Sequence, residues 1–538
     1  MQGKRIAGFG FWVSVLLSAC GGAAESRPPR LSPEENRAGM NQRAEAATVP
    51  KLVQLVDDRR LLTLTPDDFR ETALKDIVAL TTPEGYRLKY RFLEIGVPVA
   101  QALSLSNDRQ LQGRLVEVAR FQSGRRARAE SLLVLAAQKR PEHLKFFKEA
   151  LLDRDVAIQF AAVEALEAWN LPEALPLLLD ASQHSWSPLI RVFSARACVR
   201  LGAPEGKARL IGFLSDTDWL MRSMAARYLG DLGTAEDADL ILGRIGRERD
   251  NHFALAELCI AGLKLWGRRN AAPANPVPPA PIRSANRPPA KVGSLFELEP
   301  LVVTAPRARV SGSQLVPPQI DAELVGLLEK IATERPPEVV VLDPSLNEVI
   351  KLVTPQGFGL YVRYTDISFL LTEGLAGTSN LTLVNRLENI ARSSPNQPVR
   401  GSAFVALGHD NTRVDLSLFE TSLRDPSLQV RFGVVEGLAA QRNPMVRGIL
   451  AGVAQTDTSL VLRLFAAQEL GRRGDAQGVD ILRRYLNDPD WVIRALATYG
   501  LGQLGDDADF ERMLINLDRE TEDHVVAENC LAVLRMSR

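Results

Sequence analysis

Histidine and cysteine, the side chains best suited to metal binding and acid–base chemistry, are few in this chain and stand far apart. No two histidines have the HExxH spacing, and no histidine and cysteine have a zinc-site spacing. The chain also has no Walker A sequence, no GxSxG elbow and no dinucleotide-binding glycine pattern. We therefore expect no catalytic residue, no metal and no cofactor, and a protein that is not an enzyme. The five histidines are His143, His184, His252, His409 and His524.

Two of these histidines recur in related segments, "DNHFALAEL" around His252 and "EDHVVAENC" around His524. Both follow acidic or amide residues where a helix is expected to begin. We interpret them as residues that help to cap the last helix of a repeat, rather than as ligands or catalysts. The cysteines Cys198, Cys259 and Cys530 form no CxxC pair and predict no disulfide framework. Cys198 in particular is expected to be a small core residue.

Two longer segments that resemble each other indicate the secondary structure of the chain. "LSDTDWLMRSMAARYLGDLG" (Leu214–Gly233) and "LNDPDWVIRALATYGLGQLG" (Leu486–Gly505) both place apolar residues at helical spacing. Asp218 predicts an N-cap and Gly233 the end of the same helix, and a shorter helix precedes them. Similar units place Gln159, Arg191 and Arg222 at equivalent positions, 32 and 31 residues apart. A helix pair repeated at this period is typical of an α-solenoid.

The repeated pattern D-x-x-(V/I/M)-R-x-x-A-x-x-x-L-G-x-L-G resembles the bacterial HEAT repeat, of the kind also found in phycobilisome lyases. The resemblance implies that the recurring arginines bind turn carbonyls or the aspartate of a neighbouring repeat, rather than an anionic ligand. It also implies that Trp219 and Trp491 pack on an adjacent helix pair. The recurring arginines are Arg191, Arg222, Arg463 and Arg494; the residues that match the pattern are Asp218, Met221, Arg222, Ala225, Leu229, Gly230, Leu232 and Gly233, and Asp490, Ile493, Arg494, Ala497, Leu501, Gly502, Leu504 and Gly505.

A constant offset of 272 residues relates the two halves of the chain, for example Asp218 to Asp490 and Glu164 to Glu436. The sequence therefore predicts an all-α protein of two tandem HEAT-like α-solenoid arrays joined by a Pro-rich linker. Array 1 comprises residues 49–267, the linker residues 268–318, and array 2, a duplicate of array 1, residues 319–538. We expect the linker to hold the arrays apart, so that each offers a similar binding surface.

The segments "TPEGY" (from Thr82) and "TPQGF" (from Thr354) are the least repeat-like. The alternation of Tyr86, Leu88, Tyr90 and Phe92 is compatible with a strand. A helix with Thr82 as its cap and Pro83 in its first position is favoured, because a lone strand would leave backbone groups unpaired.

The N-terminal residues predict an address. A basic "MQGKR" and an apolar "IAGFGFWVSVLL" precede Leu17-Ser18-Ala19-Cys20, which resembles the bacterial lipobox. This resemblance implies a signal peptide (residues 1–19) and a lipid anchor on Cys20. Residues 20–48 are rich in Gly, Ala, Pro and charge and lack apolar periodicity, which predicts a flexible tether. Gly21 and Gly22 follow the cysteine, rather than the aspartate typical of inner-membrane retention. We therefore expect a bacterial envelope protein, lipid-anchored at the outer membrane and facing the periplasm.

Residues 296–310, "FELEPLVVTAPRARV", resemble the TonB box of outer-membrane receptors, which acts by adding a strand to its partner. A TonB-linked accessory protein is therefore an alternative function, and a divergent lyase-like enzyme is another.

Composition narrows the partners. Lys plus Arg equals Asp plus Glu at 65 each, so no basic excess favours nucleic acid. The sequence indicates no small-molecule substrate. We expect a scaffold that binds other envelope proteins on a concave surface lined by the second helices of the repeats. Candidate contact residues there are Arg196, Arg200, Arg227, Gln468 and Arg472.

Overall fold

The computed structural model describes residues 33–57, 71–122, 124–248, 251–270, 318–333, 344–365, 367, 369–370, 372, 381–409 and 415–538. Within these ranges every regular element is a helix, and none of the helices is long and apolar enough to cross a membrane. The signal peptide, Cys20 and the TonB-box-like residues 296–310 lie outside the described residues.

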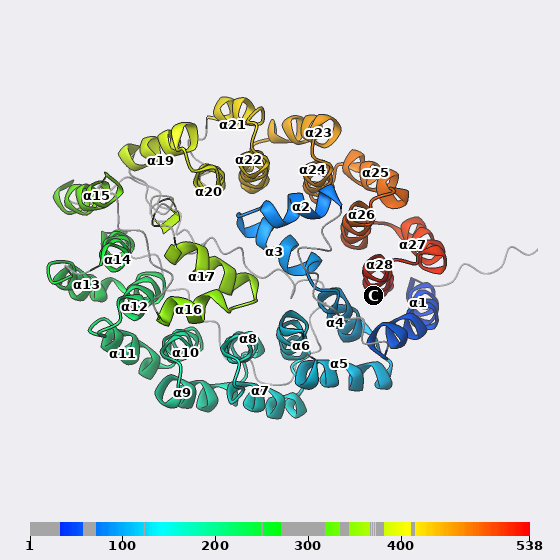
Figure 1. Cartoon of the computed structure of the whole chain (residues 1–538), viewed down its shortest axis with the longest axis horizontal. Coiled ribbons are helices and arrows are strands. Elements are labelled where there is room, and N and C mark those ends of the chain that lie inside the picture. Colours follow the sequence, from blue (N-terminus) through cyan, green and yellow to red (C-terminus); the bar gives the residue numbers. More distant parts are fainter. Residues whose placement is uncertain are drawn as a thin grey trace, which may run out of the picture.

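The helices of array 1 alternate between the outside and the inside of a ring (Figure 1). The first helix of each pair, the outer helix, faces away from the centre, and the second, the inner helix, faces towards it. α4 (Gly96–Leu105) lies on the ring between α6 (Arg125–Ala137) and α28 (Asp523–Met536). The pairs are α5 (Arg109–Phe121) with α6 (Arg125–Ala137), α7 (Leu144–Leu151) with α8 (Val156–Trp169), α9 (Ala174–His184) with α10 (Pro188–Arg200), α11 (Pro204–Phe213) with α12 (Trp219–Leu232), and α13 (Ala238–Ile245) with α14 (His252–Asn270).

Array 2 repeats this arrangement, which confirms the expected all-α solenoid. Small residues let its inner helices approach closely: a Cβ on Gly502 would lie 2.8 Å from the Ala532 Cβ, and one on Gly230 of array 1 would lie 2.7 Å from the Ala261 Cα. The pairs are α19 (Leu381–Ser393) with α20 (Gln397–Gly408), α21 (Leu416–Ser422) with α22 (Leu428–Ala440), α23 (Val446–Thr456) with α24 (Leu460–Arg472), α25 (Ala476–Arg484) with α26 (Trp491–Leu504), and α27 (Asp507–Arg519) with α28 (Asp523–Met536).

The turn between outer and inner helix is built as the repeat pattern implies. The Asp218 side chain caps α12 by accepting from Leu220 N at 2.9 Å. Arg222 donates to the carbonyls of Asp216 and Thr217, both at 3.0 Å, and to the Glu248 carboxylate at 2.8 Å. Arg494 makes the equivalent set of bonds in array 2. The structural interpretation of these arginines is therefore confirmed for Arg222 and Arg494.

The two arrays close on each other rather than standing apart. α1 (Pro33–Asp57) packs on α28, the last helix of array 2, and α15 (Pro318–Thr333) packs on α14, the last inner helix of array 1. Arg37 Nη1 donates to the carbonyl of Arg538 at 2.7 Å. The expectation of two separated arrays is wrong, because each array supplies a helix that covers the exposed end of the other.

Helix α1 also overturns part of the expectation of a flexible tether. Residues 33–48 belong to α1, where a flexible tether was expected. Ala44, Thr48 and Leu52 are fully buried at a spacing of four residues, so one stripe of α1 faces the ring. The stripe is hard to recognise in the sequence, because one of its members, Thr48, is polar and Pro50 stands inside the helix.

Two further helix pairs lie inside the ring (Figure 1). They are α2 (Thr72–Ala79) with α3 (Pro83–Phe92), and α16 (Pro344–Ile350) with α17 (Pro355–Thr365). The "TPEGY" segment is helical as expected: the Thr82 side chain accepts from Gly85 N at 3.3 Å, and Pro83 is the first helical residue. The centre of the ring is thus filled by helices and is not an open concave surface.

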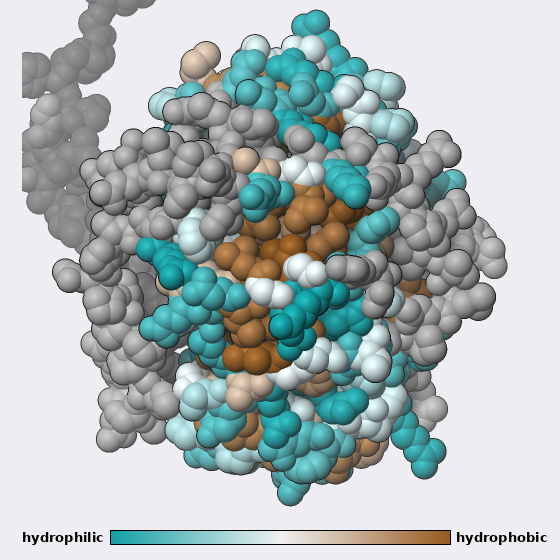
Figure 2. All heavy atoms as spheres, turned by 90° about the vertical axis from the view of Figure 1, so that its left-hand side faces the viewer, coloured by the Kyte–Doolittle hydropathy of each residue, from teal (hydrophilic) through white to brown (hydrophobic). Residues whose placement is uncertain are grey.

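On the outside, apolar side chains reach the surface where α13 and α15 flank α14 (Figure 2). Leu242, Ile245 and Leu324 all lie within 3.6 Å of the position that a Cβ on Gly262 would take. These contacts form the seam between array 1 and the first helix of array 2.

Candidate functional site

The two central helix pairs, α2–α3 and α16–α17, each dock on the opposite array. In α2, Asp76 accepts a hydrogen bond from Ser459, the residue before α24, at 2.7 Å. In α16, Glu348 accepts one from Ser187, the residue before α10, at 2.5 Å. Asp76 and Glu348 are related by the offset of 272, and so are Ser187 and Ser459. The two copies therefore bind each other reciprocally.

The N-termini of α3 and α17 each meet a buried glutamate of the other array. The backbone N–H of Glu84 donates to Glu436 at 3.3 Å. Gln356, with its amide oriented to suit its neighbours, donates to Glu164 at 2.6 Å and accepts from Arg196 at 3.0 Å. Glu164 and Glu436 are the equivalents noted in the sequence, and the structure gives them a shared role. Each carboxyl lies where the helix offers unsatisfied N–H groups.

Burial dominates the acidity of these two glutamates. It raises the pKa of Glu164 to about 8, although a hydrogen bond with Thr354 and the charge of Arg196 oppose the shift. It raises the pKa of Glu436 to about 8 as well, and the neighbouring Glu84 carboxylate adds to that shift. Both glutamates therefore bind a proton in the ring more readily than in solvent.

A buried ion pair lies near the C-terminal end of each of the central helices α3 and α17. Arg363 of α17 donates through Nε and Nη2 to both oxygens of Glu257 in α14, at 2.5 and 2.8 Å, and the Tyr364 hydroxyl donates to the same carboxylate at 3.0 Å. Arg91 of α3 binds both oxygens of Glu528 in α28 in the same way. All four charged side chains are almost fully buried. These bidentate pairs fix the orientation of α3 and α17.

Aromatic rings complete the contact and correct one expectation. Trp219 packs against Phe253 and Tyr364, with ring centroids 5.3 and 6.2 Å away. Trp491 packs against His524 and Phe92, at 5.1 and 6.5 Å. The tryptophans thus pack on neighbouring helices, as the repeat pattern implies. Through Tyr364 of α17 and Phe92 of α3, each tryptophan also contacts the central helix pair of the other array.

These rings show that His524 is equivalent to Phe253, so its pairing with His252 is wrong. α28 begins at Asp523 and α14 at His252, although Glu248 and Glu520 bind equivalent arginines at the full offset. The connection before α28 is therefore one residue shorter. His524 does not cap its helix: it stacks on Phe92 with a centroid distance of 5.3 Å, and burial lowers its pKa to about 3.

The centre of the arrangement is a stacked pair, Tyr86 and Phe358, with ring centroids 5.9 Å apart. These residues are also related by the offset of 272, so each copy contributes the same position. The contact therefore lies on a pseudo-two-fold axis, and the ring is organised like a homodimer within one chain.

The five residues expected to contact a partner protein lie on inner helices, as predicted. Arg196, Arg227 and Gln468 are buried, whereas Arg200 and Arg472 are exposed. Their contacts here are internal. Arg196 and Arg200 bind Glu167 at 3.2 and 2.9 Å, Arg227 lies 3.9 Å from Asp231, and Gln468 and Arg472 donate to Gln503 at 3.1 and 3.0 Å. Binding of a separate protein by these residues stays a prediction.

A different surface could not be found from the repeat pattern. Phe121, Leu152 and Trp186 are 72%, 78% and 60% exposed. Phe121 is the last residue of the outer helix α5, and Leu152 and Trp186 lie in the turns that follow the outer helices α7 and α9. Successive turns of this kind line one edge of a solenoid, so the three side chains form a row, here called the turn-edge row. The Arg120 guanidinium holds Phe121 from 4.8 Å away and binds Glu149 at 2.9 Å. The equivalent residues in array 2 are Ser393, Arg424 and Thr458.

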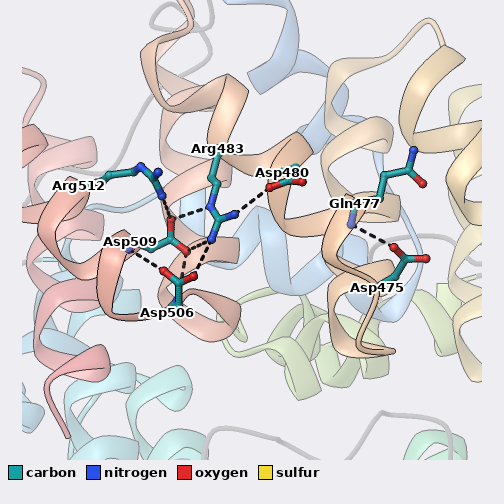
Figure 3. Close-up of polar contacts among 7 residues, drawn as sticks. All are labelled: Asp475, Gln477, Asp480, Arg483, Asp506, Asp509 and Arg512. Atoms are coloured by element: carbon teal, nitrogen blue, oxygen red, sulfur yellow. Dashed lines mark hydrogen bonds and ion pairs between the residues drawn. The ribbon is translucent and has the colours of Figure 1, made fainter.

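An acidic cluster on the outer ring is a joint between helices (Figure 3). Arg483 of α25 binds Asp480, Asp506 and Asp509 at 2.8, 3.0 and 2.8 Å, and Arg512 binds Asp509 at 2.7 Å. Two guanidinium groups therefore offset two of the three negative charges in this cluster. In the part of the chain that the structure describes, no three His, Cys, Asp or Glu residues are placed to hold a metal ion. Cys198, Cys259 and Cys530 are buried free thiols, and Cys198 is the small core residue expected.

Comparison with known proteins identifies the repeat. A family model described as HEAT repeats matches residues 114–192, 182–258 and 450–535. Similar solved structures include human deoxyhypusine hydroxylase in complex with glycerol, 14% identical over 69% of this chain and 97% of that chain, with a TM-score of 0.24. Karyopherin Kap121p bound to Pho4p is 12% identical over 93% of this chain and 50% of that chain, with a TM-score of 0.30. No curated protein matches the chain. The chain carries HEAT repeats in three places, two in array 1 and one in array 2, within an all-α solenoid.

Proposed function

We propose that this protein is a lipid-anchored scaffold of the bacterial cell envelope, which binds other envelope proteins through the turn-edge row and catalyses no reaction. The HEAT-repeat solenoid supports a scaffold that interacts with proteins. The observation that carries the proposal is the row itself. Phe121, Leu152 and Trp186 are large apolar side chains left in solvent, a composition typical of binding surfaces.

Comparison with array 2 indicates that the turn-edge row is not needed for the fold. Array 2 builds the same turns with Ser393, Arg424 and Thr458, so the fold does not need apolar residues there. Tryptophan and phenylalanine supply large contact areas and are enriched in protein interfaces, and tryptophan is a frequent hot spot. Internal ion pairs such as Arg120–Glu149 and Arg125–Asp155 satisfy the charges around the row. We therefore expect a partner that buries apolar side chains there.

The proposed anchor is consistent with this surface. Each inner helix begins at the turn edge of the ring and ends at the opposite edge. Arg538, two residues after the end of α28, therefore lies at that opposite edge. Arg37, near the start of α1, binds the Arg538 carbonyl and so lies at that opposite edge. A lipid on Cys20, a short stretch before Pro33, would attach the ring to the membrane by that edge. The turn-edge row would then face away from the membrane.

Capture from bacterial envelopes tests the binding surface. A tagged chain and the variant F121S/L152R/W186T are crosslinked and purified in parallel; the variant carries the residues that array 2 tolerates. Met445→Ser, an exposed apolar residue outside the row, is the matched control. We expect the row variant to lose at least about tenfold of the captured partner, as hot-spot removal predicts, and the control to keep it. Recovery of the unsubstituted protein alone in every condition would remove the scaffold proposal.

Membrane fractionation tests the anchor separately. Cys20→Ser should release the chain from the outer-membrane fraction and abolish incorporation of labelled palmitate. An unchanged distribution would contradict lipidation at Cys20 but leave the turn-edge row untouched.

Two alternatives keep their own tests. α14 and α15 pack on each other, and residues 271–317 connect them in the sequence. Residues 296–310 within this connection favour a TonB-linked role, which failure of that peptide to bind a TonB C-terminal domain would exclude. Lyase-like activity is the other alternative, and bilin transfer by the purified protein would be its evidence.

A further inference from the structure

The contacts that close the ring do not depend on which chain supplies each array. Asp76–Ser459, Arg91–Glu528 and Glu84–Glu436 all join array 1 to array 2. So do Glu348–Ser187, Arg363–Glu257 and Gln356–Glu164, in the opposite direction. The described residues thus form an isologous interface of the kind that joins two subunits of a symmetric dimer.

Residues 271–317 are the one covalent connection between the arrays, and 47 positions separate Asn270 from Pro318. The helices that they connect belong to different arrays but pack against each other as α14 and α15. A connection of this length can lead either to the array of the same chain or to that of another. Exchange of identical elements between protomers is a low-cost route to dimers.

We propose that a second copy of this chain is a partner of the ring: array 1 of one chain closes a ring with array 2 of another, and the reverse. The exchanged dimer contains two complete rings, each with the same buried contacts as the single chain. No contact is gained or lost, so the balance is set by concentration. A covalent connection holds its ends at an effective concentration on the order of 1 mM. At about 10 µM, the unsubstituted protein should therefore contain exchanged dimer on the order of one per cent.

Reversing one buried ion pair across two chains shifts this balance. In a chain with Arg91→Glu, two carboxylates face each other inside the closed ring, and in a chain with Glu528→Arg, two guanidinium groups do so. In the exchanged dimer of these two chains, one ring contains both substitutions as an opposite-charge pair, and the other ring is unsubstituted. Breaking a buried pair is strongly unfavourable, so only the exchanged dimer leaves every pair satisfied.

The experiment co-expresses full-length Arg91→Glu and Glu528→Arg chains with different tags and purifies them through both tags in turn. The double variant R91E/E528R in a single chain is the control, and it should be a soluble monomer. We expect a one-to-one heterodimer, at least tenfold more abundant than the exchanged dimer of two differently tagged unsubstituted chains. The absence of soluble heterodimer, although the double variant folds as a monomer, would overturn the proposal.

A second pair covers the case in which the double variant does not fold. Arg363→Glu and Glu257→Arg reverse the equivalent contact on the other side of the pseudo-two-fold axis. The same heterodimer is expected from these two chains. Separate monomers of unsubstituted chains with no mixed-tag species, measured at a protein concentration of about 100 µM, would also overturn the proposal, because about ten per cent exchange is expected there.

Discussion

The centre of the ring and its turn edge have followed different rules since the duplication. At the centre, the two copies keep the same chemistry at equivalent positions. Thr82 and Thr354 cap α3 and α17, and Glu436 and Glu164 accept hydrogen bonds at the starts of these helices. Arg91 and Arg363 form the buried ion pairs. At the turn edge, array 1 has Phe121, Leu152 and Trp186, whereas array 2 has polar residues. Each copy must satisfy the other at the centre. The edge has no such internal partner, so it can differ and acquire a function.

Removal of one partner from a central ion pair should have the largest effect. Arg363→Met leaves the Glu257 carboxylate buried without its counter-charge, because both oxygens now bind Arg363. We expect the free energy of unfolding to fall by about 3–5 kcal/mol in urea titrations. Arg43→Met is the matched control, since its pair with Glu511 is half exposed and should contribute about 0–1 kcal/mol. Equal losses in both variants would contradict the special role of the centre.

Closing the gap between two inner helices should have a smaller effect. Gly230→Ala places a methyl group 2.7 Å from the Ala261 Cα, so α12 and α14 must separate. We expect a loss of about 1–3 kcal/mol, measured by thermal unfolding. Gly212 in outer helix α11 has no atom within 4 Å of an added Cβ. Its change to alanine should be neutral or stabilising, and the comparison is informative only if both variants stay helical by circular dichroism.

The pH dependence tests the two central glutamates. Burial raises the pKa of Glu164 and of Glu436 to about 8, above the usual value of 4.5. A raised folded-state pKa stabilises the fold below the unfolded value, and this contribution is lost as the pH rises through about 8. We expect stability to fall from about pH 5 to about pH 8, by at most about 1.4 kcal/mol per pH unit for each carboxyl, and to level off at higher pH.

The variant E164Q/E436Q should flatten that slope, because a glutamine cannot release a proton. Urea midpoints at pH 6 and pH 9 for both proteins provide the measurement. An identical fall in the variant would assign the pH dependence to other groups.

The turn edge should show the smallest effect on stability. F121S/L152R/W186T changes only side chains that are mostly in solvent, so unfolding should shift by about 0.5 kcal/mol or less for each substitution. Differential scanning calorimetry of this variant, beside the capture experiment, separates binding from folding. A large loss of stability would mean that the row packs on the ring and is not free to bind a partner.

The local structure of the repeats could be predicted from the sequence, because it depends on neighbours in the chain. Asp218 caps the helix that starts beside it, Arg222 reaches turn carbonyls five and six residues away, and Thr82 caps α3. The ring could not be predicted in this way. Its closure depends on pairs such as Arg91 and Glu528, which are 437 residues apart, and no spacing within one repeat indicates them.

Two features were missed in the sequence, the turn-edge row and the register before α28, each for a physical reason. An exposed Leu152 or Trp186 is indistinguishable in sequence from a core residue, since only the fold decides which turn residues face solvent. The constant offset of 272 also concealed the shorter connection before α28. The matching histidine letters favoured the pairing of His252 with His524, whereas the helix starts and the ring contacts of Phe253 and His524 show the true register.

The closed ring has a consequence for the order of folding. Arg37 and Arg538 are in contact although 501 positions separate them. Contacts between such distant residues form slowly, because a large loss of chain entropy precedes them. During synthesis from the N-terminus, the inner helices of array 1 are complete long before α16, α17 and α28 exist. We therefore expect a nascent intermediate with an uncovered apolar interior, in need of a chaperone until the last helix arrives.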